Sequence, residues 1–178
     1  MTAEPHLPNP TAPRLLVVDD EEIVLVGLRE TLRQQGYAVS TAQNAVQALE
    51  LLQQNQFAAV LSDQQMPMLT GLEFLSQVKK NQPDASRILI TAVLNLNTVI
   101  DAINKTEVFR FILKPWHRED LLLTVAKAVD RHRAICRERQ LLSQAISMNQ
   151  TLLQANQALE RQIREERELR RGEQEAPS

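Results

Sequence analysis

Short apolar segments alternate with helical patterns along the first two-thirds of the chain, and this alternation constrains the fold more than any other feature of the sequence. Strands that are apolar on both faces are typical of a parallel sheet covered by helices on both sides. We therefore predict an α/β domain built from five β–α pairs. The predicted strands are residues 14–18, 37–42, 57–62, 87–91 and 108–113, and the predicted helices are residues 23–36, 44–55, 71–82, 95–106 and a long tract from 118.

Composition and charge exclude several classes of protein. The chain has 178 residues, of which 43% are hydrophobic, a net charge of −2 and one cysteine, Cys136. This charge gives no basic field that would attract nucleic acid, and one cysteine cannot form an internal disulfide framework. The apolar runs are far too short to span a membrane. We therefore expect a cytoplasmic protein with no membrane partner and a disordered, proline-rich leader at residues 1–13.

Polar and charged residues end or follow four of the predicted strands. Asp19 and Asp20 follow the first strand, Asp63 the third, Thr91 ends the fourth and Lys114 follows the fifth. In a doubly wound parallel sheet the ligand site lies beyond the carboxyl ends of the strands. We therefore expect these residues to share one polar pocket.

The chemistry of such a pocket follows from its residue types. Carboxylates that gather in one place raise one another's pKa unless a cation lies among them. A hard divalent cation with oxygen ligands, Mg²⁺ foremost, relieves that repulsion. A carboxylate beside Mg²⁺ can attack phosphorus and form an aspartyl phosphate. On this hypothesis Lys114 neutralises phosphoryl oxygens, and the Thr91 hydroxyl donates a hydrogen bond to one of them.

Residues 14–131 resemble the receiver domain of two-component response regulators. The resemblance implies a flavodoxin-like five-stranded parallel sheet in the order 2-1-3-4-5. It also implies a switch controlled by phosphorylation, not an enzyme with multiple turnover, and a sensor histidine kinase or phosphotransfer protein as its partner. The matching elements are the pair Asp19-Asp20, the D-x-x-M-P-x-x-x-G loop from Asp63 to Gly71, Thr91-Ala92, Phe111 and Lys114-Pro115.

The resemblance assigns roles to four of these residues. Asp63 would accept the phosphoryl group from a phosphohistidine of the kinase. Thr91 and Lys114 would sense that group, and Phe111 would rotate as Thr91 moves. The peptide bond between Lys114 and Pro115 would be cis, which bonds before proline tolerate at modest cost.

The resemblance also implies a set of metal ligands. Asp20 and Asp63 would bind Mg²⁺ directly, the backbone carbonyl of Gln65 would be a further ligand, and Asp19 would help through water. One alternative function is a Mg²⁺-dependent phosphohydrolase that turns over an aspartyl phosphate. The haloacid-dehalogenase pattern needs a second aspartate two residues after the nucleophile, and Gln65 at that position argues against this alternative.

Neither proline nor glycine occurs between residues 118 and 171, which allows one long helix. We predict a receiver domain at residues 14–131, a helical coiled-coil extension at 132–171 and a disordered tail at 172–178. An isolated helix with a thin apolar stripe is marginal in water, so we predict a parallel homodimer through this helix. With Leu142 at heptad position a, the a positions of the seam are Leu142, Asn149, Asn156 and Ile163, and the d positions are Ala145, Leu152, Leu159 and Glu166.

A run of arginines near the start of this extension raises the question of DNA binding. Arg131, Arg133, Arg137 and Arg139 resemble the basic region that precedes a zipper. Glutamates interleave further on and no turn with a second helix follows. We therefore do not expect direct binding to nucleic acid.

The segment FRFILKPW, residues 109–116, indicates the kind of regulator to which the chain is most similar. It resembles receivers that precede cyclic-di-nucleotide phosphodiesterases or regulators of hydrogenase genes. No such output domain lies within the 178 residues. The chain is therefore either a fragment of a longer regulator or a receiver whose output is its own coiled coil, and the sequence leaves both open.

Overall fold

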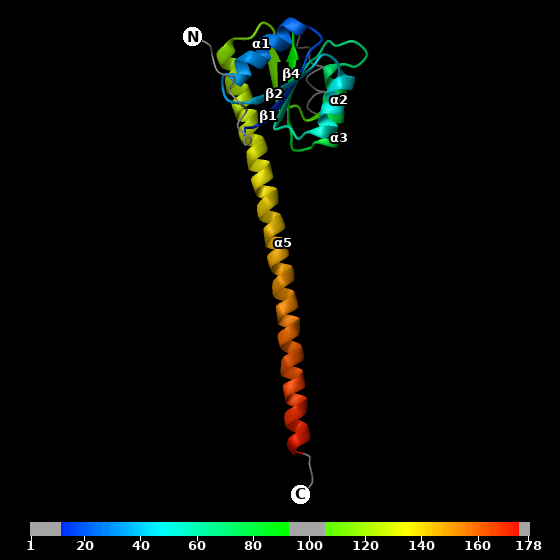
Figure 1. Cartoon of the computed structure of the whole chain (residues 1–178), viewed down its shortest axis with the longest axis vertical. Coiled ribbons are helices and arrows are strands. Elements are labelled where there is room, and N and C mark those ends of the chain that lie inside the picture. Colours follow the sequence, from blue (N-terminus) through cyan, green and yellow to red (C-terminus); the bar gives the residue numbers. More distant parts are fainter. Residues whose placement is uncertain (1–11, 93–105, 175–178) are drawn as a thin grey trace. The chain divides into compact units, whose positions relative to one another are not determined.

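The computed structural model describes residues 12–92 and 106–174, with side chains as far as residue 167. One parallel sheet has the strand order β2-β1-β3-β4-β5. Every strand end lies within two residues of its predicted position, so the predicted fold class and strand order are confirmed (Figure 1). The strands are β1 (Arg14–Val18), β2 (Ala38–Ala42), β3 (Ala59–Asp63), β4 (Ser86–Thr91) and β5 (Arg110–Leu113).

Among the described residues, four of the predicted helices are present. They are α1 (Glu22–Arg33), α2 (Ala45–Gln54), α3 (Gly71–Asn81) and α5 (Arg118–Gln174). The helix predicted at residues 95–106 lies almost entirely outside the described residues, as do most of the predicted leader and the end of the predicted tail. The chain divides into two compact units between Ile135 and Cys136.

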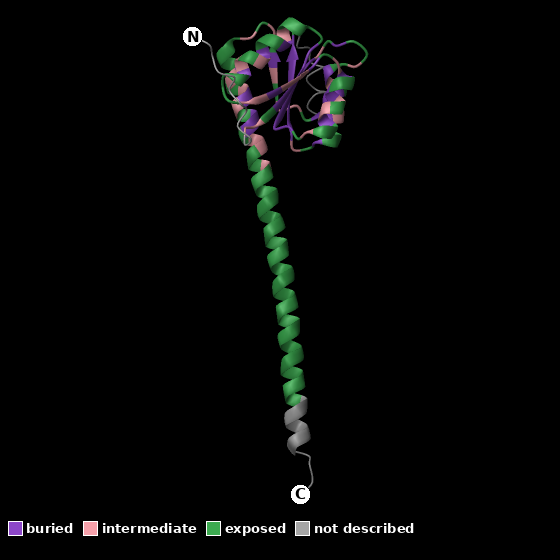
Figure 2. Ribbon diagram, viewed as in Figure 1, coloured by how far each residue is buried: buried purple, intermediate pink, exposed green. Residues whose placement is uncertain are grey.

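The two faces of the sheet bury separate apolar clusters. Side chains alternate along each strand. Leu15 and Val17 of β1 therefore pack with α1 and the first turns of α5, whereas Leu16 and Val18 pack with α2 and α3. These β1 side chains are fully buried, because β1 has a strand on each side and helices over each face. Figure 2 shows the buried strands between the helices.

A buried glutamine anchors the start of β3, the strand that carries Asp63 at its other end. The Gln82 side chain donates hydrogen bonds to the carbonyls of Leu52, at 2.8 Å, and Asn55, at 2.6 Å. Its oxygen accepts a hydrogen bond from the backbone N–H of Phe57 at 2.9 Å. These bonds satisfy the last turn of α2, where carbonyls lack partners within the helix, and tie that turn to the segment that enters β3.

The second unit differs from the first in its exposure. Its described residues are helical, which confirms the predicted long C-terminal helix. Every side chain from Cys136 to Arg167 is exposed. Within the described part of the chain, none of the helices has the length and apolar character needed to cross a membrane.

Candidate functional site

The carboxyl ends of the parallel strands bring the predicted site residues together. The register of β1 against β3 sets Asp19 level with Asp63, and the register of β4 against β5 sets Lys114 one residue beyond Thr91. The residues Asp19, Asp63 and Thr91 are buried, with 1%, 4% and 3% of their residue surface exposed. Such buried carboxylates require compensation.

Lys114 supplies that compensation to both acids. Its Nζ lies 2.6 Å from Asp63 Oδ1 and 3.1 Å from Asp19 Oδ2. Its backbone N–H donates to the Thr91 carbonyl at 2.9 Å, which ties the lysine to the end of β4. The sequence predicted that Lys114 faces the pocket. It did not predict that one ammonium group would join Asp19 to Asp63.

The pKa shifts at the site follow from this arrangement. Burial raises the pKa of Asp19, and the backbone N–H of Glu21, 3.0 Å from Oδ1, together with the Lys114 ammonium only partly opposes that rise. Burial alone would lower the pKa of Lys114, but its hydrogen bonds to Asp63 and Asp19 outweigh burial and raise this pKa. Lys114 is therefore held in its charged form at the sheet edge.

The loop after β3 closes tightly on the Asp63 peptide. The backbone N–H of Gln65 donates to Asp63 Oδ2 at 2.6 Å. The N–H of Gly71 donates to the carbonyl of Gln64 at 3.0 Å, and a Cβ on Gly71 would lie 2.1 Å from the Asp63 carbonyl oxygen. Only glycine fits there. The last residue of the D-x-x-M-P-x-x-x-G pattern is thus required by a close backbone approach.

Gln64 is a supporting residue that the sequence analysis missed. Its backbone N–H donates to the Ile90 carbonyl at 2.8 Å, which extends the pairing of β3 with β4 past Asp63. Its side-chain oxygen accepts a hydrogen bond from the N–H of Leu72 at 3.2 Å. A polar residue in a loop is common, so its type alone carried no signal that it links β4 to the start of α3.

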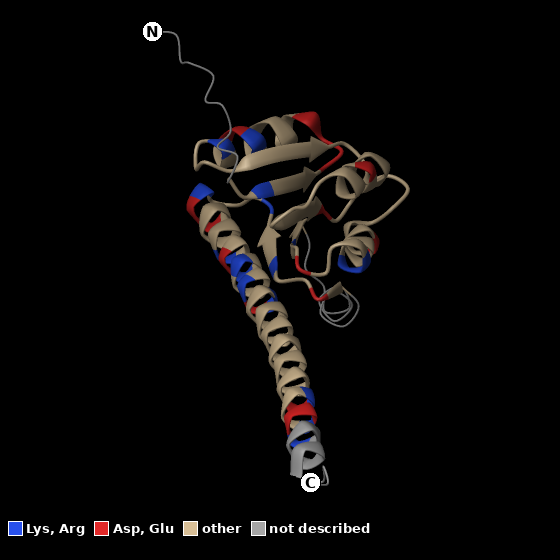
Figure 3. Ribbon diagram, turned by 60° about the horizontal axis from the view of Figure 1, so that its bottom comes forward, with Lys and Arg blue, Asp and Glu red and all other residues tan. Residues whose placement is uncertain are grey.

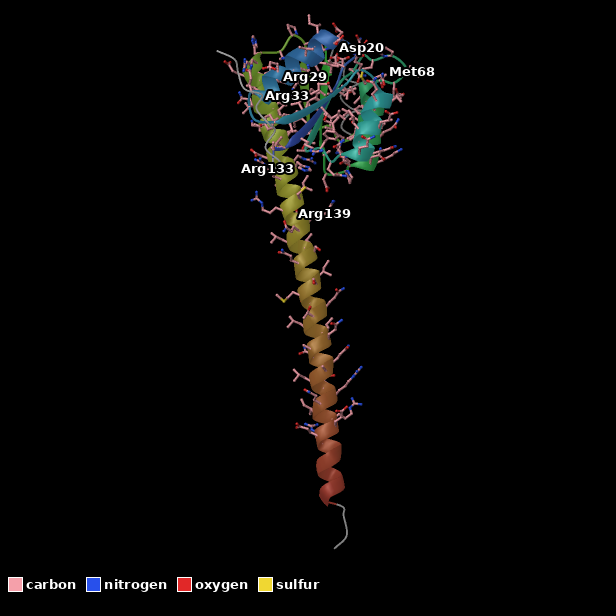
Figure 4. All side chains as sticks on the ribbon, viewed as in Figure 1. Asp20, Arg29, Arg33, Met68, Arg133 and Arg139 are labelled. Atoms are coloured by element: carbon pink, nitrogen blue, oxygen red, sulfur yellow. The ribbon has the colours of Figure 1, made fainter. Side chains whose placement is uncertain are left out.

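Asp20 differs from Asp19 because its side chain is exposed and, within the described part of the chain, has no ion-pair partner. Figure 4 places Asp20 and Met68 at the same end of the first unit. No three His, Cys, Asp or Glu side chains in the described ranges already form a metal-binding group. The side chains of Asp19, Asp20 and Asp63 offer only carboxylate oxygens as possible donors. Such an oxygen-only set fits a hard cation such as Mg²⁺.

The two predicted switch residues lie on neighbouring strands. Thr91 ends β4 and pairs with Leu113 of β5. Phe111 is partly buried in β5 and packs against the apolar cluster beneath α2 and α3. The peptide bond between Lys114 and Pro115 is cis, as predicted. Lys114 therefore directly follows the same short strand, β5, that carries Phe111.

Comparison with known proteins decides the family. The model of the response regulator receiver domain matches residues 15–126. The chain belongs to this family. Membership implies signalling that depends on phosphorylation, and receiver domains interact with histidine kinases or phosphotransfer proteins.

The hydrogenase transcriptional regulatory protein HoxA of Cupriavidus necator is 38% identical over 116 residues, which are 65% of this chain and 24% of HoxA. The alginate biosynthesis transcriptional regulatory protein AlgB of Pseudomonas putida is 33% identical over 117 residues, 66% of this chain and 26% of AlgB. The chain thus spans about a quarter of the length of these curated relatives. The predicted similarity to receivers of hydrogenase regulators is confirmed.

Two solved structures show the same receiver fold. The signal receiver domain of an HD domain-containing protein from Pseudomonas fluorescens Pf-5 has a TM-score of 0.67 and 32% identity, and the match covers 69% of this chain and 98% of that one. The response regulator TrrA of Thermotoga maritima, solved with Mg²⁺-BeF, has a TM-score of 0.59 and 30% identity, with 65% and 98% covered.

The close approach of Gly71 to Asp63 generates a stability prediction. We expect Gly71→Ala to lower the free energy of unfolding by about 1–3 kcal/mol, because the added methyl group overlaps backbone that cannot easily move. Gly27→Ala is the matched control, since a Cβ there meets nothing within 4 Å. It lies inside α1 and should raise stability by up to about 1 kcal/mol. Urea unfolding of both variants measures the difference, and an unchanged midpoint for Gly71→Ala would contradict the structural explanation.

Proposed function

We propose that Asp63 accepts a phosphoryl group from a histidine kinase and that the chain works as a stoichiometric switch. The observation that carries this proposal is the ion pair of Lys114 with the buried Asp63 and Asp19 at the carboxyl edge of the sheet. Asp63 is the acid that ends the central strand β3. A cation already lies against its carboxylate, at the place where a phosphoryl group would add negative charge.

The proposed reaction is a direct transfer. A carboxylate oxygen of Asp63 attacks the phosphorus of a phosphohistidine on a sensor kinase or phosphotransfer protein. An oxygen–phosphorus bond forms as the phosphorus–nitrogen bond breaks, and the imidazole leaves with that electron pair. Lys114 then balances charge on the phosphoryl oxygens, and the Thr91 hydroxyl donates a hydrogen bond to one of them. Electrostatic stabilisation of this kind accounts for most of the catalysis in phosphoryl transfer.

Magnesium fits the same residues. Asp20, Asp63 and the Gln65 carbonyl would hold the ion directly, with Asp19 acting through water. When bound, Mg²⁺ supplies positive charge to the phosphoryl oxygens. The exposure of Asp20 leaves its oxygens accessible for that role, while Asp19 already accepts hydrogen bonds from Glu21 and Lys114.

The output we propose runs through β5 and α5 to a paired helix. A shift of Thr91 toward the phosphoryl group would displace the neighbouring strand β5, where Phe111 packs against the core. The pairing joins two chains in parallel through the seam of Leu142, Asn149, Leu152, Asn156, Leu159 and Ile163. Phosphorylation can alter this pairing only if the phosphoryl group stabilises either the paired or the unpaired helix more than the other.

Phosphoryl acceptance can be tested with acetyl phosphate and Mg²⁺. We expect the wild-type chain to take up one equivalent and Asp63→Asn to take up none, because the nucleophilic oxygen is replaced by an amide. Asp130→Asn is the control: Asp130 is an exposed aspartate on α5, and its loss should leave labelling unchanged. Labelling of Asp63→Asn at the wild-type rate would refute the assignment, and sustained phosphate release from small esters would favour the phosphohydrolase alternative.

Measurements of Mg²⁺ affinity can distinguish the role of Asp20 from that of Glu22. Asp20→Ala should weaken Mg²⁺ affinity at least about tenfold, since loss of even an outer ligand at metal sites has effects of that size. Glu22→Ala should leave affinity unchanged, because Glu22 is exposed in the first turn of α1. Titration of each variant with Mg²⁺ measures this contrast. Equal losses from the two substitutions would mean that the acidic cluster has been assigned incorrectly.

Self-association can be tested with two substitutions that both introduce a glutamate. Leu152→Glu puts a charge into the proposed seam, whereas Gln154→Glu puts one on the opposite side of the helix. We expect light scattering to find an oligomer for the wild-type chain and for Gln154→Glu, and a monomer for Leu152→Glu. A monomeric wild-type chain would refute the pairing. A mass distribution that beryllium fluoride leaves unchanged would refute its coupling to phosphorylation.

A further inference from the structure

The helix of the second unit carries more exposed apolar side chains than a two-stranded seam can cover. Among the described residues of this helix, each large apolar side chain is between 49% and 65% exposed. Leu142, Leu152, Leu159 and Ile163 belong to the a and d positions of the proposed seam. Four others do not: Leu141 and Met148 occupy g positions, and Ile146 and Leu153 occupy e positions.

These flanking residues widen the apolar face on both sides. At 3.6 residues per turn, the large apolar residues between 141 and 163 cover an arc of about 160° around the helix axis. A strict a/d stripe is the narrow seam of a two-stranded coil, while a wider stripe is typical of a helix within a bundle. The proposed pair would therefore leave half of the described large apolar side chains of the helix partly in water.

Asparagine lowers the apolar content of the seam itself. Asn149 and Asn156 lie at a positions, in the middle of the apolar arc. Burial of these amides requires hydrogen-bond partners and weakens a pair. Further apolar burial could come from the flanks, if Ile146 and Leu153 of one helix packed against Leu141 and Met148 of another copy.

Charge is distributed in a way that permits close assembly. Residues 140–159 contain no Asp, Glu, Lys or Arg. Figure 3 shows this uncharged length of α5 in tan between coloured residues on either side. Several copies of the segment can therefore pack side by side without burying a charge, and like charges do not face one another along it.

We propose that two of the proposed pairs combine into a four-helix bundle of identical chains over residues 141–159. In such a bundle the helices lie side by side, and each helix contacts two neighbours. The directions to these neighbours differ by about 90° around the helix axis, so that the g, a, d and e positions are all covered. Four equivalent helices form a closed assembly in which no apolar flank is left over. This inference rests on the proposed pairing and is independent of phosphorylation at Asp63.

Sedimentation equilibrium of the full chain over a range of concentrations tests the bundle. We expect a limiting mass of four chains. The double variant Met148→Glu with Leu153→Glu should sediment as two chains, because it places charges on both flanks and leaves the a and d positions intact. The double variant Ser147→Glu with Gln154→Glu is the control. It adds the same charges at f positions on the outer face, so its mass should equal that of the wild type.

Each outcome separates the bundle from the pairing and from the receiver function. A limiting wild-type mass of two or three chains overturns the bundle, and a mass of two leaves the pairing in place. A monomer overturns both. A flank variant that remains a tetramer overturns the assignment of the flanks. Helix content by circular dichroism and phosphoryl uptake at Asp63 should be unchanged in both double variants, which shows that a change of mass does not result from unfolding.

Discussion

The ammonium group of Lys114 lies between two buried carboxylates, and the geometry of the receiver unit depends on this contact. Asp19 and Asp63 are almost inaccessible to water, and neither could keep its charge there without a cation or several hydrogen-bond donors. The lysine meets both within hydrogen-bonding distance. The strand order 2-1-3-4-5 permits this contact, because β1 and β3 are neighbours in it and β5 lies on the same side of β1 as β3.

The same contact supports the proposal that this site responds to phosphorylation. Buried ion pairs are sensitive to the removal or addition of charge, since one partner cannot easily be left alone. On the proposed function, a phosphoryl group on Asp63 would add negative charge beside Lys114 and so alter the ion pairs that the lysine makes with Asp19 and Asp63. Lys114 is joined to the Thr91 carbonyl through its backbone. We therefore propose that a change in the ion pair would reach β4 and β5, where Phe111 packs against the core.

The two units follow different physical rules. In the first unit, helices and sheet bury one another, and separate apolar clusters fill both faces of the sheet. In the second unit, a helix keeps all its described side chains exposed. A single helix gains little stability from its own hydrogen bonds, so an apolar face of this width is stable in water only when other helices cover it. We propose that copies of the same chain cover this face, because its uncharged central stretch at residues 140–159 can pack against itself without burying a charge.

Much of the first unit could be predicted from local patterns. The apolar segments gave the strands to within two residues, since a buried parallel strand must be apolar along its whole length. The rule that ligands bind at the carboxyl ends of parallel strands identified Asp19, Asp63, Thr91 and Lys114 as neighbours. The D-x-x-M-P-x-x-x-G pattern implied a need for Gly71, but only the structure shows its cause, a backbone approach to Asp63.

The sequence by itself determined which segments are strands and helices, which residues end the strands and where the tail carries apolar residues, because these depend on neighbours within a turn or two. Only the tertiary structure decided that Asp19 is buried while Asp20 is exposed, that Gln64 links β4 to α3, and that Lys114 bonds both acids. Asp19 and Lys114 are 95 residues apart. The distance between them depends on strand register and twist across the whole sheet, and no local pattern of residues encodes that distance.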